Sequence, residues 1–166
     1  TFFAFGYKAG TMTTSVMQKV NFRTLAAGDP EDCTFEFNVE PDVDCAWVEV
    51  IPSDKGQFYH WLVYPSYYTA ADAKDYIRMY IENSYEGDIP SFSSWELSLG
   101  TDTATAWDLY PETEYKVGAI IMDYDTGEFL SEMFFSEPFM TLAKTYADIT
   151  INMEYGPYYD LGELIK

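Results

Sequence analysis

The sequence contains few basic residues and no long hydrophobic run. Its 166 residues include 28 Asp and Glu but only 9 Lys and Arg, which gives a formal net charge of −19. Nucleic acids and anionic membrane leaflets attract basic surfaces, so this charge argues against both as partners. Because no stretch of 18 or more apolar residues occurs, we expect no membrane insertion of this segment.

Catalytic motifs are also missing. His60 is the single histidine, and no Ser–His–Asp or Cys–His catalytic set can be identified around it from the sequence. The acidic segment 123–128 has the carboxylates that calcium prefers, but it lacks EF-hand spacing, and Asp and Gly also suit a hairpin turn. We therefore expect a non-catalytic chain with no metal and no cofactor. A remote alternative is an accessory domain of a secreted hydrolase, which a cleft bringing several acids near His60 would favour.

Two further features of the sequence are its pair of cysteines and its first residues. Cys33 and Cys45 are expected to be unpaired thiols, because their side chains should face opposite ways; a disulfide is the alternative. The chain starts with Thr1 and an aromatic run typical of the middle of a strand. We interpret it as a processed or partial product of a longer protein.

Alternating apolar residues dominate the rest. Hydrophobic residues make up 48% of the chain, which excludes disorder in spite of the charge. The period-2 pattern predicts about seven strands, at residues 34–39, 46–51, 58–64, 94–99, 103–108, 114–124 and 129–135. One helix is expected from Thr69 to about Ser84, with Asp72 completing a capping box. In the third strand Tyr59 and Trp61 should face inward and His60 outward. Short strands with a single helix indicate an all-β antiparallel sandwich.

Part of the sequence recurs. Residues 22–26 (Phe-Arg-Thr-Leu-Ala) resemble residues 139–143 (Phe-Met-Thr-Leu-Ala) at an offset of 117, and Tyr7 and Gly10 match Tyr124 and Gly127 at the same offset. The chance similarity of two hairpins is the alternative. We predict three parts: residues 1–28 as the C-terminal strands of a preceding repeat, 29–143 as a complete domain, and 144–166 as the start of a following repeat.

One motif points to a family. Residues 109–117 (Leu-Tyr-Pro-Glu-Thr-Glu-Tyr-Lys-Val) resemble the L-x-P-x-T-x-Y signature of fibronectin type III domains. Three further features, the closing Phe-x-Thr-Leu, the segment 48–54 and the inserted helix, resemble the fibronectin type III-like (immunoglobulin-like) repeats of predicted surface lipoproteins from Bacteroidetes-type gut bacteria. The resemblance implies a fibronectin type III-like β-sandwich in which Tyr115 forms a tyrosine corner and Leu109 fills the core below it. It also implies an extracytoplasmic, secreted or cell-surface location of the outer-membrane lipoprotein type.

Function follows from these expectations. The leading interpretation is a structural or binding repeat, a spacer or adhesin-like module, whose partners are neighbouring repeats, other copies of the chain paired through the end strands, or surface proteins. The alternative is a carbohydrate-binding module, in which exposed rings of Trp47, Tyr64, Tyr67 and Tyr68 stack on sugars. These rings could instead pack beneath the helix.

Overall fold

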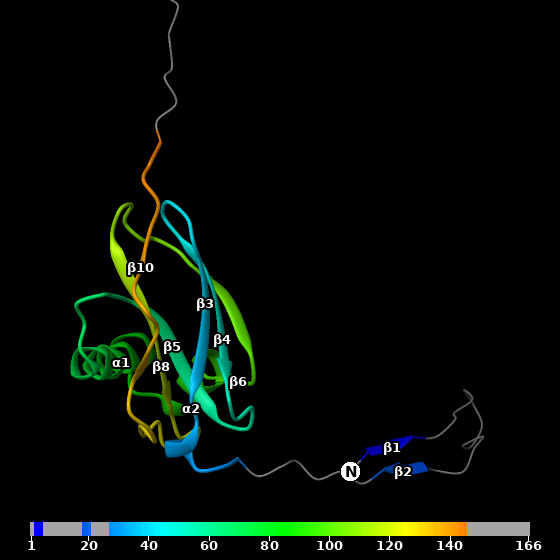
Figure 1. Cartoon of the computed structure of the whole chain (residues 1–166). Coiled ribbons are helices and arrows are strands. Elements are labelled where there is room, and N and C mark those ends of the chain that lie inside the picture. Colours follow the sequence, from blue (N-terminus) through cyan, green and yellow to red (C-terminus); the bar gives the residue numbers. More distant parts are fainter. Residues whose placement is uncertain (1, 5–17, 21–26, 146–166) are drawn as a thin grey trace, which may run out of the picture.

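The computed structural model describes residues 2–4, 18–20 and 27–145, and Figure 1 shows its arrangement. Strands β1 (Phe2–Ala4) and β2 (Gln18–Val20) pair antiparallel, with Phe2 opposite Val20. The other strands form two antiparallel sheets. The predicted pairing of residues 144–166 with other strands falls almost wholly outside the described residues.

The first sheet has three strands in the order β3-β4-β7. Strands β3 (Phe35–Pro41) and β4 (Ala46–Pro52) form a hairpin in which Phe37 lies opposite Val50. Strand β7 (Asp102–Ala106) pairs with the other edge of β4. Every second residue of β3 and β4 points toward the second sheet, which is the alternation that the sequence predicts.

The second sheet has the order β10-β8-β5-β6. Its central strands are β5 (Phe58–Pro65) and β8 (Glu114–Ile121), and β6 (Ser98–Leu99) covers only the first two residues of β5. Strands β9 (Phe134–Phe135) and β10 (Phe139–Met140) both pair with β8. The break between them contains Pro138, which has no backbone N–H to donate to a ladder.

The two sheets pack face to face around an apolar core. Val48 and Val50 from the first sheet meet Tyr59, Val117 and Ile121 from the second, and all five are buried. Two antiparallel sheets packed in this way form a β-sandwich, so the coarse fold prediction is confirmed.

Helices cover the outer face of the second sheet (Figure 1). Helix α1 (Ala70–Tyr85) begins at the Thr69 cap, where Thr69 and Asp72 form the predicted capping box. It buries Ala73, Ile77 and Ile81 against the sheet, a spacing of four residues that keeps them on one face. The molecule therefore has three layers and a second core between the sheet and the helices.

Three local predictions in this layer are wrong. Helix α2 (Ile89–Glu96) follows α1, so the insertion has two helices rather than one. A short 3-10 helix, η1 (Pro30–Asp32), lies outside the insertion, before β3. The strand expected over 94–99 is reduced to β6, because Ser94 lies in α2. His60 does face away from the inter-sheet core, but it is 1% exposed because the helices cover it.

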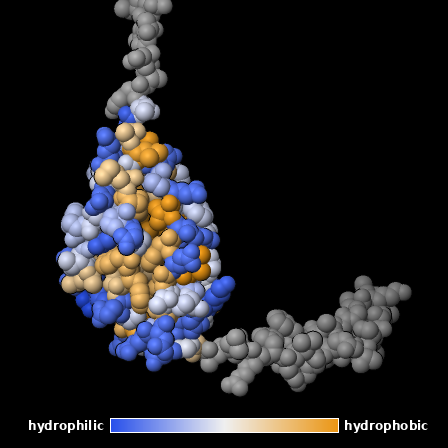
Figure 2. All heavy atoms as spheres, viewed as in Figure 1, coloured by the Kyte–Doolittle hydropathy of each residue, from blue (hydrophilic) through white to orange (hydrophobic). Residues whose placement is uncertain are grey.

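The surface of this folded unit is mixed in hydropathy. Figure 2 shows hydrophilic residues over the ends and margins of one face, with hydrophobic residues gathered along β3 and β10. There Phe37, Val39, Phe135 and Phe139 border a shallow hollow of about 410 Å³ at the side of the sandwich. No helix in the described segments is both long and apolar enough to cross a bilayer.

Candidate functional site

The loop between β7 and β8 is closed by the side chain of Tyr115. The Tyr115 hydroxyl accepts a hydrogen bond at 3.0 Å from the backbone N–H of Tyr110, five residues upstream. Tyr115 is buried, and Leu109 packs against the inter-sheet core while its N–H donates to Asp44 O at 2.9 Å. The phenol therefore joins the loop to the second sheet, which is the geometry of a tyrosine corner.

Thr141, which directly follows the last strand β10, completes this closure. Its buried hydroxyl donates to Tyr110 O at 2.6 Å and accepts from Thr113 N at 3.0 Å. The backbone N–H of Leu142 donates to Asp42 O in the β3–β4 turn at 3.0 Å. The Thr of the closing Phe-x-Thr-Leu sequence thus satisfies backbone groups of the loop that Tyr115 anchors, which is a physical reason for a threonine here.

Of the four predicted ligand-binding aromatics, Tyr64 is not at the surface. It is 2% exposed because it lies in the core below α1, where it packs edge-on against Tyr76 with ring centroids 6.0 Å apart. Glycine at position 118 leaves the room that its ring needs, since a Cβ there would lie 2.8 Å from Tyr64 Cε2. The ring of Tyr64 is therefore unavailable for stacking on a ligand, and this residue is removed from the candidate site.

Tyr67 and Tyr68 do lie together in a groove of about 470 Å³. Tyr67 is 78% exposed, Tyr68 is half-buried, and their ring centroids lie 5.4 Å apart with an interplanar angle of 56°. Four residues of α1 line the other side: Asp72, Asp75, Tyr76 and Met79. We call this the tyrosine groove.

The tyrosine groove is held from below. Buried Tyr64 packs against Tyr68, with centroids 5.8 Å apart, as well as against Tyr76. Burial, followed by the neighbouring Tyr76 and Tyr68, raises the pKa of the Tyr64 hydroxyl above its ordinary value, so the hydroxyl stays neutral. Two of the groove's rings thus rest on a fixed aromatic base, which reduces the conformational entropy that ligand binding would cost.

The carboxylates give the tyrosine groove its charge. Asp72 Oδ2 accepts hydrogen bonds from the Thr69 hydroxyl and the Thr69 N–H, which lower the pKa of Asp72 and keep it ionised. Asp75 Oδ1 lies 2.8 Å from Arg78 Nη1, in a pair whose side chains are both more than 60% exposed. The groove therefore offers ring faces beside two carboxylates, a combination that can stack on a pyranose and accept hydrogen bonds from its hydroxyl groups.

Trp47 lies elsewhere. It is 37% exposed on the outer face of the β3-β4-β7 sheet, opposite Glu40 and Thr105 in the register, whereas the tyrosine groove lies on the far side of the other sheet. Tyr76 and Met79 of the groove were not among the residues predicted from the sequence. Positions 72, 75, 76 and 79 recur at helical spacing on the face opposite Ile77, and this was the signal that could have identified them.

A second cleft, of about 280 Å³, has His60, Glu96 and Asp102 among the residues that line it. Each group has a structural role. The Glu96 carboxylate accepts hydrogen bonds from the hydroxyls of Tyr80 and Tyr85, and Asp102 accepts from Trp61 Nε1 at 2.8 Å. His60 Nδ1 lies 3.1 Å from the backbone oxygen of Glu96, and burial lowers the pKa of His60. The acids in this cleft thus position aromatic side chains of the two cores.

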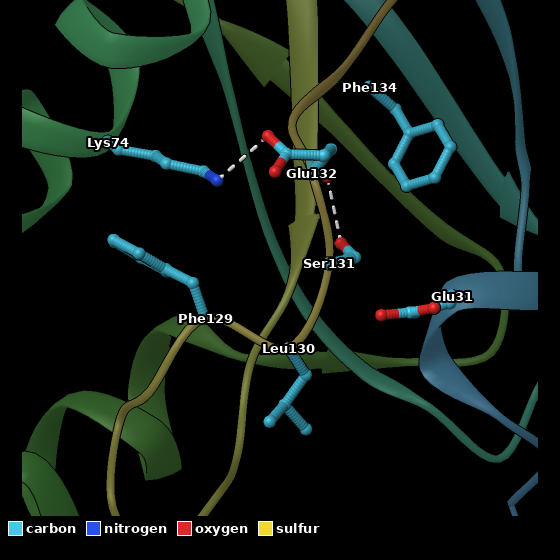
Figure 3. Close-up of a pocket in the computed structure, with 7 residues that line it drawn as sticks. All are labelled: Glu31, Lys74, Phe129, Leu130, Ser131, Glu132 and Phe134. Carbon is cyan, nitrogen blue, oxygen red and sulfur yellow. Dashed lines mark hydrogen bonds and ion pairs between the residues drawn. The ribbon is translucent and has the colours of Figure 1, made fainter.

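The hollow in Figure 3, of about 550 Å³, lies between α1 and residues 129–134. Lys74 Nζ points to Glu132 and lies 3.1 Å from its carboxylate, while Glu31 reaches in from η1. Lys74 and Arg78 also lie over the ring of Phe129, at 5.9 and 5.0 Å from its centroid. The positive charges of this hollow therefore have partners within the chain.

The remaining candidates are accounted for locally. Asp123 Oδ1 accepts hydrogen bonds from the N–H groups of Asp125 and Thr126, so the acidic segment 123–128 is a turn with Gly127 at φ 71°. Between residues 27 and 145 no cluster of three or more metal-ligating side chains occurs. Cys33 and Cys45 are both free thiols.

Comparisons with known proteins give no further guide. No model of a known protein family matches the chain, and no curated protein matches it.

Proposed function

We propose that residues 29–143 form a fibronectin type III-like domain that acts as a non-catalytic structural or binding repeat of a secreted or cell-surface protein. The observation that carries this proposal is the Tyr115 hydroxyl accepting from Tyr110 N inside a two-sheet sandwich. The strand order gives further support. Counted from β3, the fourth strand of the domain is β6, which pairs with β5. In an antibody constant domain the fourth strand, D, instead joins the sheet that contains the first two strands.

The acidic surface suits a repeat of this kind. A high net charge keeps a protein soluble and limits non-specific association. The carboxylates of the second cleft are held by tyrosine, tryptophan and serine side chains, which supports a structural role for them. A spacer or adhesin-like module needs only a stable fold and a presented surface.

Surface labelling tests the location. An antibody raised against residues 29–143 should bind intact cells that produce the protein, and protease added outside those cells should remove the epitope. An antibody against a known cytoplasmic protein of the same cells is the control for leakage. Labelling that requires permeabilised cells would contradict the proposal.

The tyrosine groove favours carbohydrate binding as a second candidate function. Its support is the juxtaposition of Tyr67, Tyr68 and Tyr76 with two carboxylates. A glycan array probed with the whole chain should show hits that Tyr67→Ala abolishes and Tyr110→Ala retains, because Tyr110 is equally exposed but lies outside the groove. An array without hits, or hits insensitive to Tyr67→Ala, would remove this candidate.

A further inference from the structure

From the charge and the rings that line the tyrosine groove, we infer that it binds an organic ammonium group, such as an amino sugar or a choline-type headgroup carries. The inference names the ligand chemistry of the groove and rests on the groove being a binding site. It does not require that the ligand be a carbohydrate, nor that the chain be a surface repeat.

The first support is electrostatic. Residues 27–145 contain 24 of the 28 acidic residues and only five of the nine basic ones, so the folded domain carries the full net charge of −19. The groove itself is lined by two carboxylates and by no lysine, arginine or histidine. The negative charge of the domain and of the groove attracts a cation both at a distance and at the site. Sulfated, sialylated or phosphorylated groups without a cation are repelled.

The second support is the aromatic lining. The face of a tyrosine ring is electronegative, and a cation within about 6 Å of its centroid is stabilised. Tyr67 and Tyr68 are tilted relative to each other and together border the groove. Tyr76 and Met79 add a third ring and an apolar contact from α1. Rings and carboxylates around one space are suited to an ammonium group that carries methyl or methine groups.

The third support is the comparison with the hollow of Figure 3, which is lined by the same helix. There, Phe129 and Glu132 already have cationic partners from the chain, because Lys74 contacts both and Arg78 lies over the ring. Among the described residues, the cationic side chain paired with a carboxylate of the tyrosine groove is that of Arg78, in an exposed pair with Asp75. Exposed pairs contribute little, so a ligand ammonium can compete with it.

A titration of the whole chain, followed by NMR at low ionic strength, tests the inference with three probes. Choline and glucosamine carry an ammonium group, and glucose is the neutral counterpart of glucosamine. We expect both cations to shift the resonances of Tyr67, Tyr76 and Met79, with glucose at least tenfold weaker than glucosamine. Raising the salt concentration should weaken both cations, because the attraction is screened.

Variants locate the site. Tyr67→Ala should weaken choline binding about two- to fivefold, the range for loss of one exposed cation–π contact. Asp75→Asn should weaken it by a similar factor without touching the helix cap, for which Asp72 is needed. Tyr110→Ala is the matched control and should leave binding unchanged, and circular dichroism checks that each variant is folded.

The outcomes separate the inference from the glycan proposal. Tighter binding of choline indicates a quaternary headgroup and tighter binding of glucosamine indicates an amino sugar; either supports the inference. Glucose binding as tightly as glucosamine would overturn it while leaving the carbohydrate candidate in place. If neither cation shifts the groove resonances at tens of millimolar, or if Tyr67→Ala and Tyr110→Ala behave alike, the inference is wrong.

Discussion

The two faces of the β10-β8-β5-β6 sheet are buried in different ways. One face meets the β3-β4-β7 sheet through apolar side chains, and its borders are closed by the hydrogen bonds of Tyr115 and Thr141. The other meets α1 and α2 through a mixed layer that includes the polar side chains of His60 and Ser93.

This difference is visible in hydrogen bonding. Among the described residues, the buried side-chain polar atoms without a partner are His60 Nε2, Tyr64 Oη and Ser93 Oγ, and all three belong to the helix-covered side. A buried polar group without a hydrogen bond costs about 1–3 kcal/mol. The polar groups of the sandwich core are therefore better satisfied, and the helix layer, which also presents the tyrosine groove, contains the three unpaired atoms.

Truncating one buried isoleucine in each core tests this comparison with the largest effect. Ile121 and Ile77 are both fully buried, Ile121 between the sheets and Ile77 on the face of α1 that packs against the second sheet. We expect Ile121→Ala to lower the free energy of unfolding by about 4 kcal/mol and Ile77→Ala by about 3 kcal/mol, since a helix can shift to fill part of the cavity. Chemical denaturation measures both. A loss below about 1 kcal/mol for Ile77→Ala would mean that the helix layer is not part of the cooperative fold.

Adding a methyl group at Gly118 should have the next largest effect. A Cβ there would meet Tyr64 Cε2 at 2.8 Å and Phe135 Cε1 at 2.9 Å, closer than such atoms pack. We expect Gly118→Ala to destabilise the protein by about 2 kcal/mol through overpacking on the helix side. The same change in a Phe135→Ala background should cost clearly less. Equal costs in the two backgrounds would show that crowding against Phe135 is not the cause.

The tyrosine corner gives a smaller effect that a matched pair can isolate. Tyr115→Phe removes the acceptor of the Tyr110 N–H and should cost about 1.5 kcal/mol, the usual penalty for a partly buried donor left unpaired. Tyr110→Phe removes a hydroxyl of the same loop at an exposed position and should cost less than about 0.5 kcal/mol. Equal stabilities of the two variants would contradict the role given to Tyr115.

The sandwich core was predictable because its signals are local. Alternation in β3 and β4, the cap at Thr69 and the turn residues each act over a few positions of the sequence. The hydrogen bond from Tyr110 N to the Tyr115 hydroxyl also lies within one short motif, since the two residues are only five positions apart. A strand break and a turn also occur at the expected proline and glycine, Pro138 and Gly127.

The helix layer was harder to predict for a tertiary reason. The expectation that His60 faces solvent assumed a sheet with one wet face, but β5 is buried on both faces. The nearly continuous aromatic and aliphatic run of β5 was the signal in the sequence for burial on both faces, because strands covered on both sides lose the alternation of apolar and polar residues. The site depended on the same fact. Tyr64 and Tyr67 are three residues apart, and only the position of α1 decides that one is buried and the other exposed.

The smallest effect concerns the pH dependence of the helix side. Burial lowers the pKa of His60, and the nearby Glu96 and the Tyr80 ring, 6.4 Å away, do not reverse this. Since the unfolded histidine binds a proton near pH 6.5 and the folded one does not, stability is complete above that pH and falls on acidification, with a slope below about 1.4 kcal/mol per pH unit for one proton. Carboxylates with lowered pKa, such as Asp72 and Asp123, add their own loss only below about pH 4. Denaturation at pH 7.5 and pH 5 should therefore show a loss in the wild type that His60→Gln does not share. The same pH dependence in the variant would place the titrating group elsewhere, and the helix-covered face would then have no distinct response to acid.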